Sequence, residues 1–228
     1  MKQLNVFCEG PTEQGFCEQV LRPHLFPTGD GIIHTLAVGK SAHHHVYGVN
    51  KYGMLRKFIL NTIRGRANHN VYFTSLLDLY ALPSDFPGMA SNTRNADNPY
   101  PYVEALEKEI EDDISHYQFY AHLQLHEYET MLFAAPEAFA IAFDNCGEQI
   151  EDLKRIAASE PSIEHIDDGI YTAPSKRIIS ILPAYGGMKS IAGPDIAEFI
   201  GIGHIRAKCP HFDQWVSRLE NIHWEQQE

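Results

Sequence analysis

The chain has 228 residues, 44% of them hydrophobic, and a net charge of −12. This length suits one large domain or one and a half small ones, and the hydrophobic content is enough for a sizeable core. Every apolar run is shorter than the roughly 20 residues of a membrane span, and the first residues lack a secretion signal, so we expect a cytoplasmic protein that makes no membrane contact. The acidic surface repels polyanions, so binding nucleic acid would require a local basic surface or a divalent metal.

The first half of the sequence alternates apolar strands with helices. The predicted elements are strands at Leu4–Cys8, Ile32–Val38, Val71–Leu77 and Phe119–Leu125, with helices at Gln14–Leu25, Tyr52–Arg64 and Tyr102–Ile114. This order predicts an α/β fold with a Rossmann-like, mostly parallel sheet flanked by helices. The loop from Pro83 to Pro101 is longer than packing requires, which favours a functional role.

The second half is mainly helical. Helices are predicted at Glu127–Phe133, Pro136–Phe143, Gln149–Ala158, Lys176–Leu182, Asp195–Gly201 and Pro210–Glu220. We expect an α/β core at 1–134 with a helical extension at 135–228 packed on it, or one single domain, because no flexible linker marks the boundary. The four cysteines form no CxxC pair, which argues against a zinc knuckle. His43-His44-His45 is interpreted as a solvated loop, with adventitious metal binding as the alternative.

Acidic residues follow three of the predicted strands. Glu9 follows the first strand, Asp78 follows the third, and Glu127 and Glu129 follow the last. Because the carboxyl ends of parallel strands share one edge, these side chains are expected to converge there. Converging carboxylates repel one another unless a hard cation neutralises them, and oxygen ligands suit Mg²⁺ or Mn²⁺. The sequence therefore predicts a metal site.

Each nearby candidate also has a structural interpretation. Glu13 can act as a general base, or it can cap a helix together with Thr12. Asp85 can bind metal or form a turn between Pro and Gly. Two residues separated by two positions diverge by about 200° on a helix, so only one of Glu127 and Glu129 would face the site unless the segment is extended. His126 can bind metal, act as a base or fix the turn through a hydrogen bond.

Basic residues that could contact a phosphate occur late in the chain. Lys176 and Arg177 follow Pro174-Ser175, a helix start whose N–H groups could bind an anion. Lys208 and His211 are further candidates, and a solvated turn is the simpler interpretation of Arg206 and Lys208. Lys189 is another late cation in this acidic chain.

Four short motifs stand in order along the chain: Glu9-Gly10-Pro11-Thr12-Glu13, Asp78-Leu79-Tyr80-Ala81-Leu82-Pro83, His126-Glu127-Tyr128-Glu129 and Thr172-Ala173-Pro174-Ser175-Lys176-Arg177. Together they resemble DUF4276, a bacterial family of domains of unknown function that is placed in the Toprim-like group. The resemblance extends over nearly the whole chain, including the segment from Ile205 to Phe212.

The wider Toprim-like group includes topoisomerases, primases and nucleases of the overcoming-lysogenization-defect type. The resemblance implies that a Glu after the first strand and an Asp-x-Asp pair after a later strand bind Mg²⁺ for phosphodiester chemistry. Glu9 and Asp78 match this pattern, but Tyr80 stands in place of the second Asp. A phenol with a pKa of ~10 is a poor Mg²⁺ ligand at neutral pH. Another carboxylate must therefore complete the site, with Glu127, Glu129 and Asp85 as candidates.

Three functions are compatible with these residues. The first is a Mg²⁺-dependent nuclease or phosphodiesterase acting on nucleic acid, in phage defence or DNA repair, with a catalytic set of Glu9, Glu13, Asp78, Glu127 and Lys176. The second is a non-catalytic partner of an ATPase complex, favoured by the missing second Asp and the acidic surface. The third is a small-nucleotide phosphohydrolase, which would need little basic surface.

Overall fold

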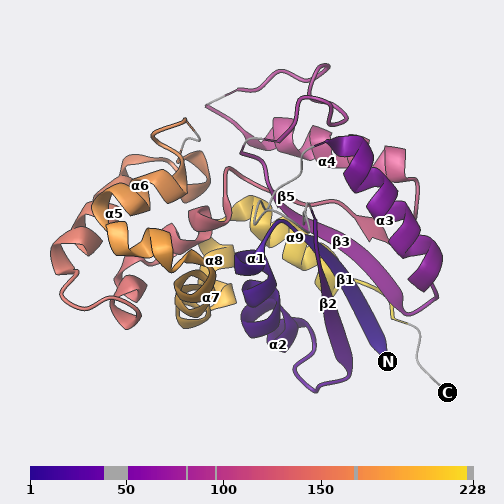
Figure 1. Cartoon of the computed structure of the whole chain (residues 1–228), viewed down its shortest axis with the longest axis horizontal. Coiled ribbons are helices and arrows are strands. Elements are labelled where there is room, and N and C mark those ends of the chain that lie inside the picture. Colours follow the sequence, from indigo (N-terminus) through magenta and orange to yellow (C-terminus); the bar gives the residue numbers. More distant parts are fainter. Residues whose placement is uncertain (39–50, 81, 96, 167–168, 225–228) are drawn as a thin grey trace.

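A parallel sheet forms the centre of the molecule (Figure 1). The computed structural model describes residues 1–38, 51–80, 82–95, 97–166 and 169–224, so His43 to His45 lie outside the described residues. The strand order is β2 (Gly31–Ala37), β1 (Lys2–Cys8), β3 (Val71–Asp78) and β4 (Phe119–Tyr120), with β5 (Leu123–Gln124) also paired to β3. All four pairings are parallel, which confirms the predicted sheet.

The last predicted strand, Phe119–Leu125, is interrupted at Ala121 and His122. The Ala121 N–H donates to Glu111 Oε1 at 2.8 Å, and the His122 N–H donates to Ser75 Oγ at 2.9 Å. Ser75 Oγ in turn donates to the His122 carbonyl. Side chains thus replace the strand ladder at these two residues, so the prediction of one continuous strand was wrong.

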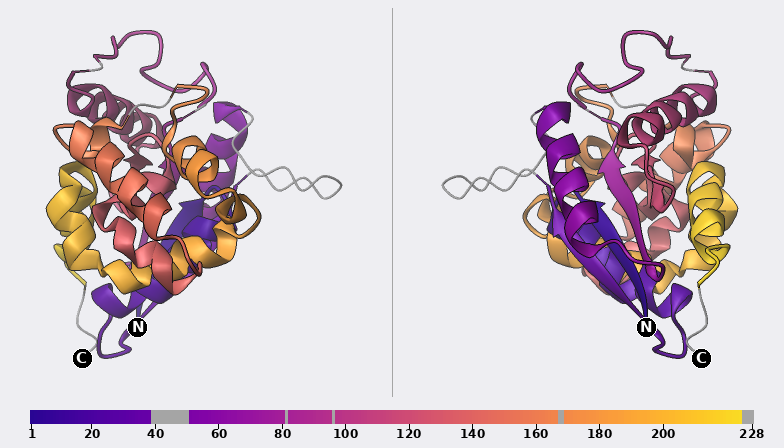
Figure 2. Two further views of the ribbon diagram at one scale, coloured as in Figure 1. Left: turned by 90° about the vertical axis from the view of Figure 1, so that its left-hand side faces the viewer. Right: turned by 90° about the vertical axis from the view of Figure 1, so that its right-hand side faces the viewer.

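Two helices cover one face of the sheet. They are α3 (Tyr52–Arg66) and α4 (Tyr100–Ile114), and they pack on the buried side chains of Phe7, Phe73 and Leu77. Burying such side chains stabilises the fold by about 1.5–3 kcal/mol each. The right-hand view of Figure 2 shows the strands between α3 and the yellow helices of the C-terminal region.

The opposite face is covered from both ends of the chain. A continuous helical segment comprises α1 (Pro11–Phe16), a π-helical stretch at Cys17–Leu21 and α2 (Arg22–Leu25). It packs beside α9 (Pro210–Glu220), where the rings of Phe16 and Phe212 meet at 5.9 Å. The core on this face joins residues on either side of position 134, including Leu4, Leu132 and Ile196.

The region after β5 is built from short helices. They are η2 (Tyr128–Ala134), η3 (Pro136–Ile141), α5 (Gly147–Ser159), η4 (Ile163–His165), α6 (Pro174–Ile181), η5 (Pro183–Gly187), α7 (Lys189–Ile200) and α8 (Ile202–Lys208), followed by α9. The elements labelled η here are 3₁₀ helices, which differ from the regular helices expected at Glu127–Phe133 and Pro136–Phe143.

Two further differences concern α7 and α8. Helix α7 begins six residues before the predicted start at Asp195 and contains Pro194 in its interior. Arg206 and Lys208, interpreted as a solvated turn, lie in α8. Arg206 pairs with Glu220 at 2.6 Å, so this short helix is tied to α9 by an ion pair that local sequence does not reveal.

The contact between α1 and α7 requires a glycine. A Cβ at Gly15 would lie 2.6 Å from Cγ of Pro194, whose ring cannot turn aside as a flexible side chain would. We therefore expect Gly15→Ala to force the helices apart and to lower the free energy of unfolding by about 1–3 kcal/mol. Urea denaturation followed by circular dichroism measures this change.

Gly53→Ala is the matched control. Gly53 lies in α3, and a Cβ there would meet nothing within 4 Å. This substitution is expected to stabilise the protein by up to about 1 kcal/mol, because alanine loses less backbone entropy on folding. Equal stability of Gly15→Ala and the wild type would contradict close packing of α1 on α7.

Candidate functional site

The acidic residues predicted from the sequence lie at the carboxyl edge of the sheet. Glu9 directly follows β1, and Asp78 is the last residue of β3. Beyond the strands, the Leu79 N–H donates to the Gln124 carbonyl at 3.0 Å and the Tyr80 N–H donates to the His126 carbonyl at 2.8 Å. The chain after β5 therefore continues beside the chain after β3 and delivers the following acidic residues to the same edge.

Backbone N–H groups hold three of these carboxylates. Glu9 Oε2 accepts from the Asp78 N–H at 3.2 Å, Asp78 Oδ1 accepts from Tyr128 at 2.8 Å, and Glu127 Oε2 accepts from Ser175 at 2.8 Å. The first bond joins the ends of β1 and β3, and the other two connect this edge to the starts of η2 and α6. An ionised carboxylate accepts about four hydrogen bonds or metal contacts, so each retains capacity for a cation.

The contact at Ser175 changes the interpretation of the start of α6. The sequence suggested that the N–H groups there could bind a phosphate. In the structure the Ser175 N–H binds the Glu127 carboxylate, and those of Lys176 and Arg177 bind the Ala173 carbonyl. The protein's own carboxylate thus occupies the anion position of this helix N-terminus.

Glu13 caps α1. Its Oε2 accepts from the Gly10 N–H at 2.7 Å, which is the glutamate half of a capping box, because Gly10 has no side chain to form the other half. Pro11 is the first helical residue. The helix therefore begins three residues before the predicted start at Gln14, and the N-cap residue is Gly10 rather than Thr12. The side chain of Glu13 is buried, and a role as a general base stays a prediction.

Glu129 forms an ion pair with a lysine at the acidic edge. Its Oε1 lies 3.0 Å from Lys189 Nζ on α7 and accepts from the Tyr185 hydroxyl at 3.2 Å. Glu127 precedes η2 with extended backbone angles, φ −145° and ψ 163°. The divergence expected for two residues of one helix therefore does not apply. Burial, followed by the nearby Glu129 carboxylate, raises the pKa of Glu127. Sequence analysis noted Lys189 but not this pair, which depends on the packing of α7.

Burial and the charges of neighbouring carboxylates raise the pKa values of four groups at the edge: Glu9, Glu13, Asp78 and Glu127. Burial, followed by the charges of Glu9 and Glu129, raises the pKa of Glu13 to about 7. Burial and the Glu9 carboxylate raise the pKa of Asp78 well above its ordinary value, and burial with Glu129 raises that of Glu127. These groups would ionise together more readily beside a cation. Carboxylate oxygens are the ligands that hard cations prefer, so these residues fit Mg²⁺ or Mn²⁺.

Two other candidates have defined partners. His126 has a left-handed backbone with φ 64°, and its Nε2 lies 3.0 Å from the Glu164 carbonyl, while Arg94 approaches Nδ1 at 3.5 Å. Both ring nitrogens are therefore engaged. The exposed Asp85 accepts the Tyr52 N–H at 3.1 Å, which caps the start of α3. Asp85 is not among the carboxylates that perturb Asp78.

The predicted phosphate-binding residues are dispersed. Lys176 is exposed near the start of α6, and Arg177 Nε donates to the Thr172 carbonyl at 2.6 Å. Lys208 is exposed at the end of α8. His211 is buried, and its Nε2 lies 2.9 Å from Glu107 Oε1. Lys176 and Arg177 directly follow Ser175, whose N–H binds Glu127, so they lie near the acidic edge. His211 lies in a different cluster.

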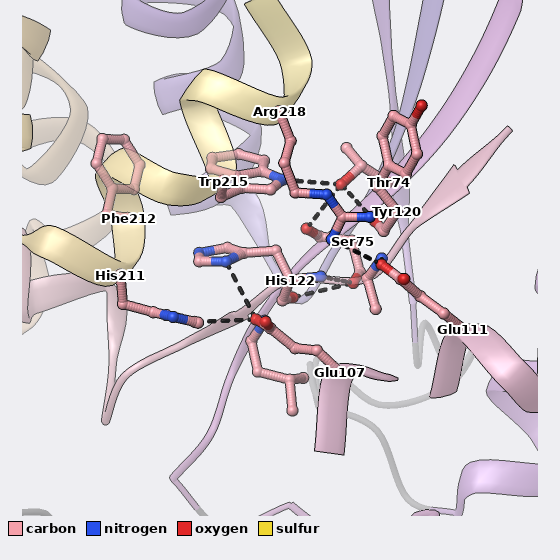
Figure 3. Close-up of polar contacts among 12 residues, drawn as sticks. Thr74, Ser75, Glu107, Glu111, Tyr120, His122, His211, Phe212, Trp215 and Arg218 are labelled. Atoms are coloured by element: carbon pink, nitrogen blue, oxygen red, sulfur yellow. Dashed lines mark hydrogen bonds and ion pairs between the residues drawn. The ribbon is translucent and has the colours of Figure 1, made fainter. Parts of the chain in front are cut away.

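That second cluster was missed by sequence analysis, apart from His211. Glu107, His122 and His211 each offer a ligand atom, and these atoms all lie within 4.8 Å of one another. Figure 3 shows both imidazoles beside the Glu107 carboxylate. The three residues are far apart in sequence and share no motif spacing. Within the described residues, the carboxylates of the sheet edge do not gather three ligand atoms within this distance.

The raised pKa of Glu13 generates a pH prediction. Its folded value of about 7 exceeds the ordinary value of 4.5, so between these pH values the folded state holds a proton that the unfolded state has released. This contribution to stability is lost as pH rises through the window. We expect Glu13→Gln to stabilise the protein by on the order of 1–3 kcal/mol above pH 7, and by less at pH 4.5. Urea unfolding in a chelator at several pH values measures the difference.

Glu148→Gln, at an exposed carboxylate in the first turn of α5, is the control and should leave the pH profile unchanged. A Glu13→Gln effect that is constant across the window would show that the Glu13 carboxyl titrates normally in the folded protein.

Comparisons with known proteins place the chain in a family. Residues 8–220 match the domain of unknown function DUF4276. A search of curated proteins gave no match. A structure of the C-terminal region of the Burkholderia pseudomallei OLD protein is similar over 96% of this chain and 99% of that chain, with 16% identity and a TM-score of 0.46. Among the described residues, no helix is both long and apolar enough to cross a membrane. The family match covers most of the sequence, and the chain belongs to the DUF4276 family.

Proposed function

We propose that this protein is a Mg²⁺- or Mn²⁺-dependent phosphodiesterase that cleaves nucleic acid. The observation that carries the proposal is the set of buried and half-buried carboxylates that repel one another at the carboxyl edge of a parallel sheet. Open α/β sheets bind ligands at this edge. The charges of Glu9, Glu13, Glu127 and Glu129 all raise the pKa of Asp78, so the cluster has an excess of negative charge that a cation would relieve.

Glu9, Asp78, Glu127 and Glu129 would hold the metal. When bound, the ion would activate water and stabilise the charge that develops on the phosphodiester. Tyr80 replaces an acidic residue of the Toprim-like pattern, and the Glu127 and Glu129 side chains supply carboxylate oxygens in its stead. Their positions are supported by the contacts of Ser175 and Lys189.

Other side chains near the edge could accept a proton from water or contact the phosphate. Glu13, with a pKa of about 7, can accept a proton from water near neutral pH. His126 is less suited to this role because both of its ring nitrogens are engaged. Lys176, exposed at the start of α6, and Lys189 beside Glu129 are two cations that could contact a phosphate at this edge.

The test is a cleavage assay of the full chain with single- and double-stranded DNA and RNA in Mg²⁺ or Mn²⁺. We expect cleavage that Glu9→Gln and Asp78→Asn each reduce at least 100-fold, on the order of what removal of a major charge-stabilising group costs. Calorimetric titration with Mn²⁺ should show binding to the wild type, weakened in both variants. Glu148→Gln, an exposed carboxylate on α5, should match the wild type in both assays.

Other outcomes distinguish the alternatives. Mn²⁺ binding with hydrolysis of nucleotides but not of polymers would identify a small-nucleotide phosphohydrolase. A failure to bind Mn²⁺ or to cleave any substrate would contradict the proposal and favour a non-catalytic partner, for example of an ATPase. In that case Lys189, rather than a metal ion, would offset the negative charge of Glu129 at the edge.

A further inference from the structure

The cluster of Glu107, His122 and His211 joins three separate parts of the fold. Glu107 lies in the middle of α4, His122 lies between β4 and β5, and His211 lies in the first turn of α9. The side chains of both histidines and the Glu107 carboxylate meet in the interior between these elements (Figure 3). The acidic edge described above contributes no residue to it.

The spacing of the ligand atoms suits a small metal ion. His211 Nε2 lies 2.9 Å and His122 Nδ1 lies 3.3 Å from Glu107 Oε1. Two ligand atoms at 2.0–2.1 Å from a tetrahedral ion lie about 3.3 Å apart. Small side-chain shifts therefore suffice to bring these atoms to coordination distance, and the backbone can stay in place.

A second observation points to a missing partner. His122 is 1% exposed and His211 is 2% exposed. Within the described residues, three buried ring nitrogens have no partner in hydrogen-bond geometry: Nδ1 and Nε2 of His122 and Nδ1 of His211. The 3.3 Å approach of His122 Nδ1 to Glu107 is an ion-pair distance without that geometry. Buried polar atoms without partners are costly, and a metal ion that accepts a nitrogen lone pair would remove this cost.

The surrounding residues hold these side chains in position. The Leu123 N–H donates to Glu107 Oε1 at 2.7 Å. The Trp215 ring stacks on His122 with centroids 4.5 Å apart and an interplanar angle of 9°, and Trp215 Nε1 donates to Thr74 Oγ1 at 2.8 Å. Such outer contacts orient metal ligands and limit their freedom before the ion binds.

The cluster also borders a cavity. A pocket of about 330 Å³ is lined by all three residues together with Trp215, Arg218 and Glu111. Three protein ligands next to open space are the arrangement of metal sites that keep one coordination position for water or another small ligand.

We propose that Glu107, His122 and His211 form a binding site for a divalent transition-metal ion of the Zn²⁺ class, with one coordination position open to the adjacent pocket. Imidazole ligands favour Zn²⁺, Co²⁺ and Ni²⁺ over Mg²⁺, so this site differs in chemistry from the carboxylate edge. The bound ion joins α4, the β4–β5 connection and α9.

The experiment uses Co²⁺ as a spectroscopic substitute for Zn²⁺. The background is the full chain with Asp78→Asn and with His43→Ala, His44→Ala and His45→Ala. These changes weaken the competing site at the sheet edge and remove the histidine run. We expect one Co²⁺ per chain, with visible absorption bands of a four- or five-coordinate ion that added Zn²⁺ abolishes. His211→Ala and Glu107→Gln should each weaken binding more than about 100-fold.

Glu111→Gln is the matched control. Glu111 lies one turn after Glu107 on α4, lines the same pocket and also accepts a backbone N–H, from Ala121. It is not part of the cluster and should leave Co²⁺ binding unchanged. Circular dichroism of every variant checks that the fold is retained.

X-ray absorption of the Zn²⁺-loaded background protein gives a readout that needs no further substitution. Two imidazole ligands and one oxygen at about 2.0–2.1 Å support the site. Absence of stoichiometric Co²⁺ or Zn²⁺ binding, or binding that His211→Ala and Glu107→Gln leave intact, would overturn it. The cluster would then be an ordinary ion pair between Glu107 and His211.

Discussion

Repulsion among buried and half-buried carboxylates at the end of the sheet is the constraint on which the site and much of the C-terminal half depend. Glu9 binds the backbone of Asp78, Asp78 binds the start of η2, and Glu127 binds the start of α6. These hydrogen bonds attach the helical region to the strands through groups that oppose one another electrostatically. Residues that lower stability by repelling one another, yet are held together by the fold, are expected at functional sites.

A different buried carboxylate connects the two candidate sites. Glu164 is 0% exposed, and its two oxygens accept the N–H groups of His211 and Phe212 at the start of α9. Its carbonyl oxygen contacts the ring of His126, the residue before Glu127. The start of α9, and with it the position of His211, therefore depends on the same segment that fixes the turn after β5.

The sheet and the acidic edge could be predicted because both follow from local patterns. Apolar runs give the strands, and parallel order brings the residue after each strand to one edge, as for Glu9 and Asp78. The interruption at Ala121, the pair of Glu129 with Lys189 and the cluster around His122 could not be predicted. Each depends on a side chain that contacts another segment of the chain, and no residue spacing in the sequence predicts such a contact.

The two sites differ in the property that sorts metal ions in proteins. The edge offers carboxylate oxygens, which suit hard cations, whereas His122 and His211 offer imidazole nitrogens, which suit transition metals. A high concentration of Mg²⁺ would therefore fill the edge without competing strongly for the histidines. Conversely, the histidine cluster borders a pocket beside Arg218, away from the carboxylates that follow β1 and β3. Because the donor sets differ, the ion proposed at α9 would exchange independently of the ion proposed at the sheet edge.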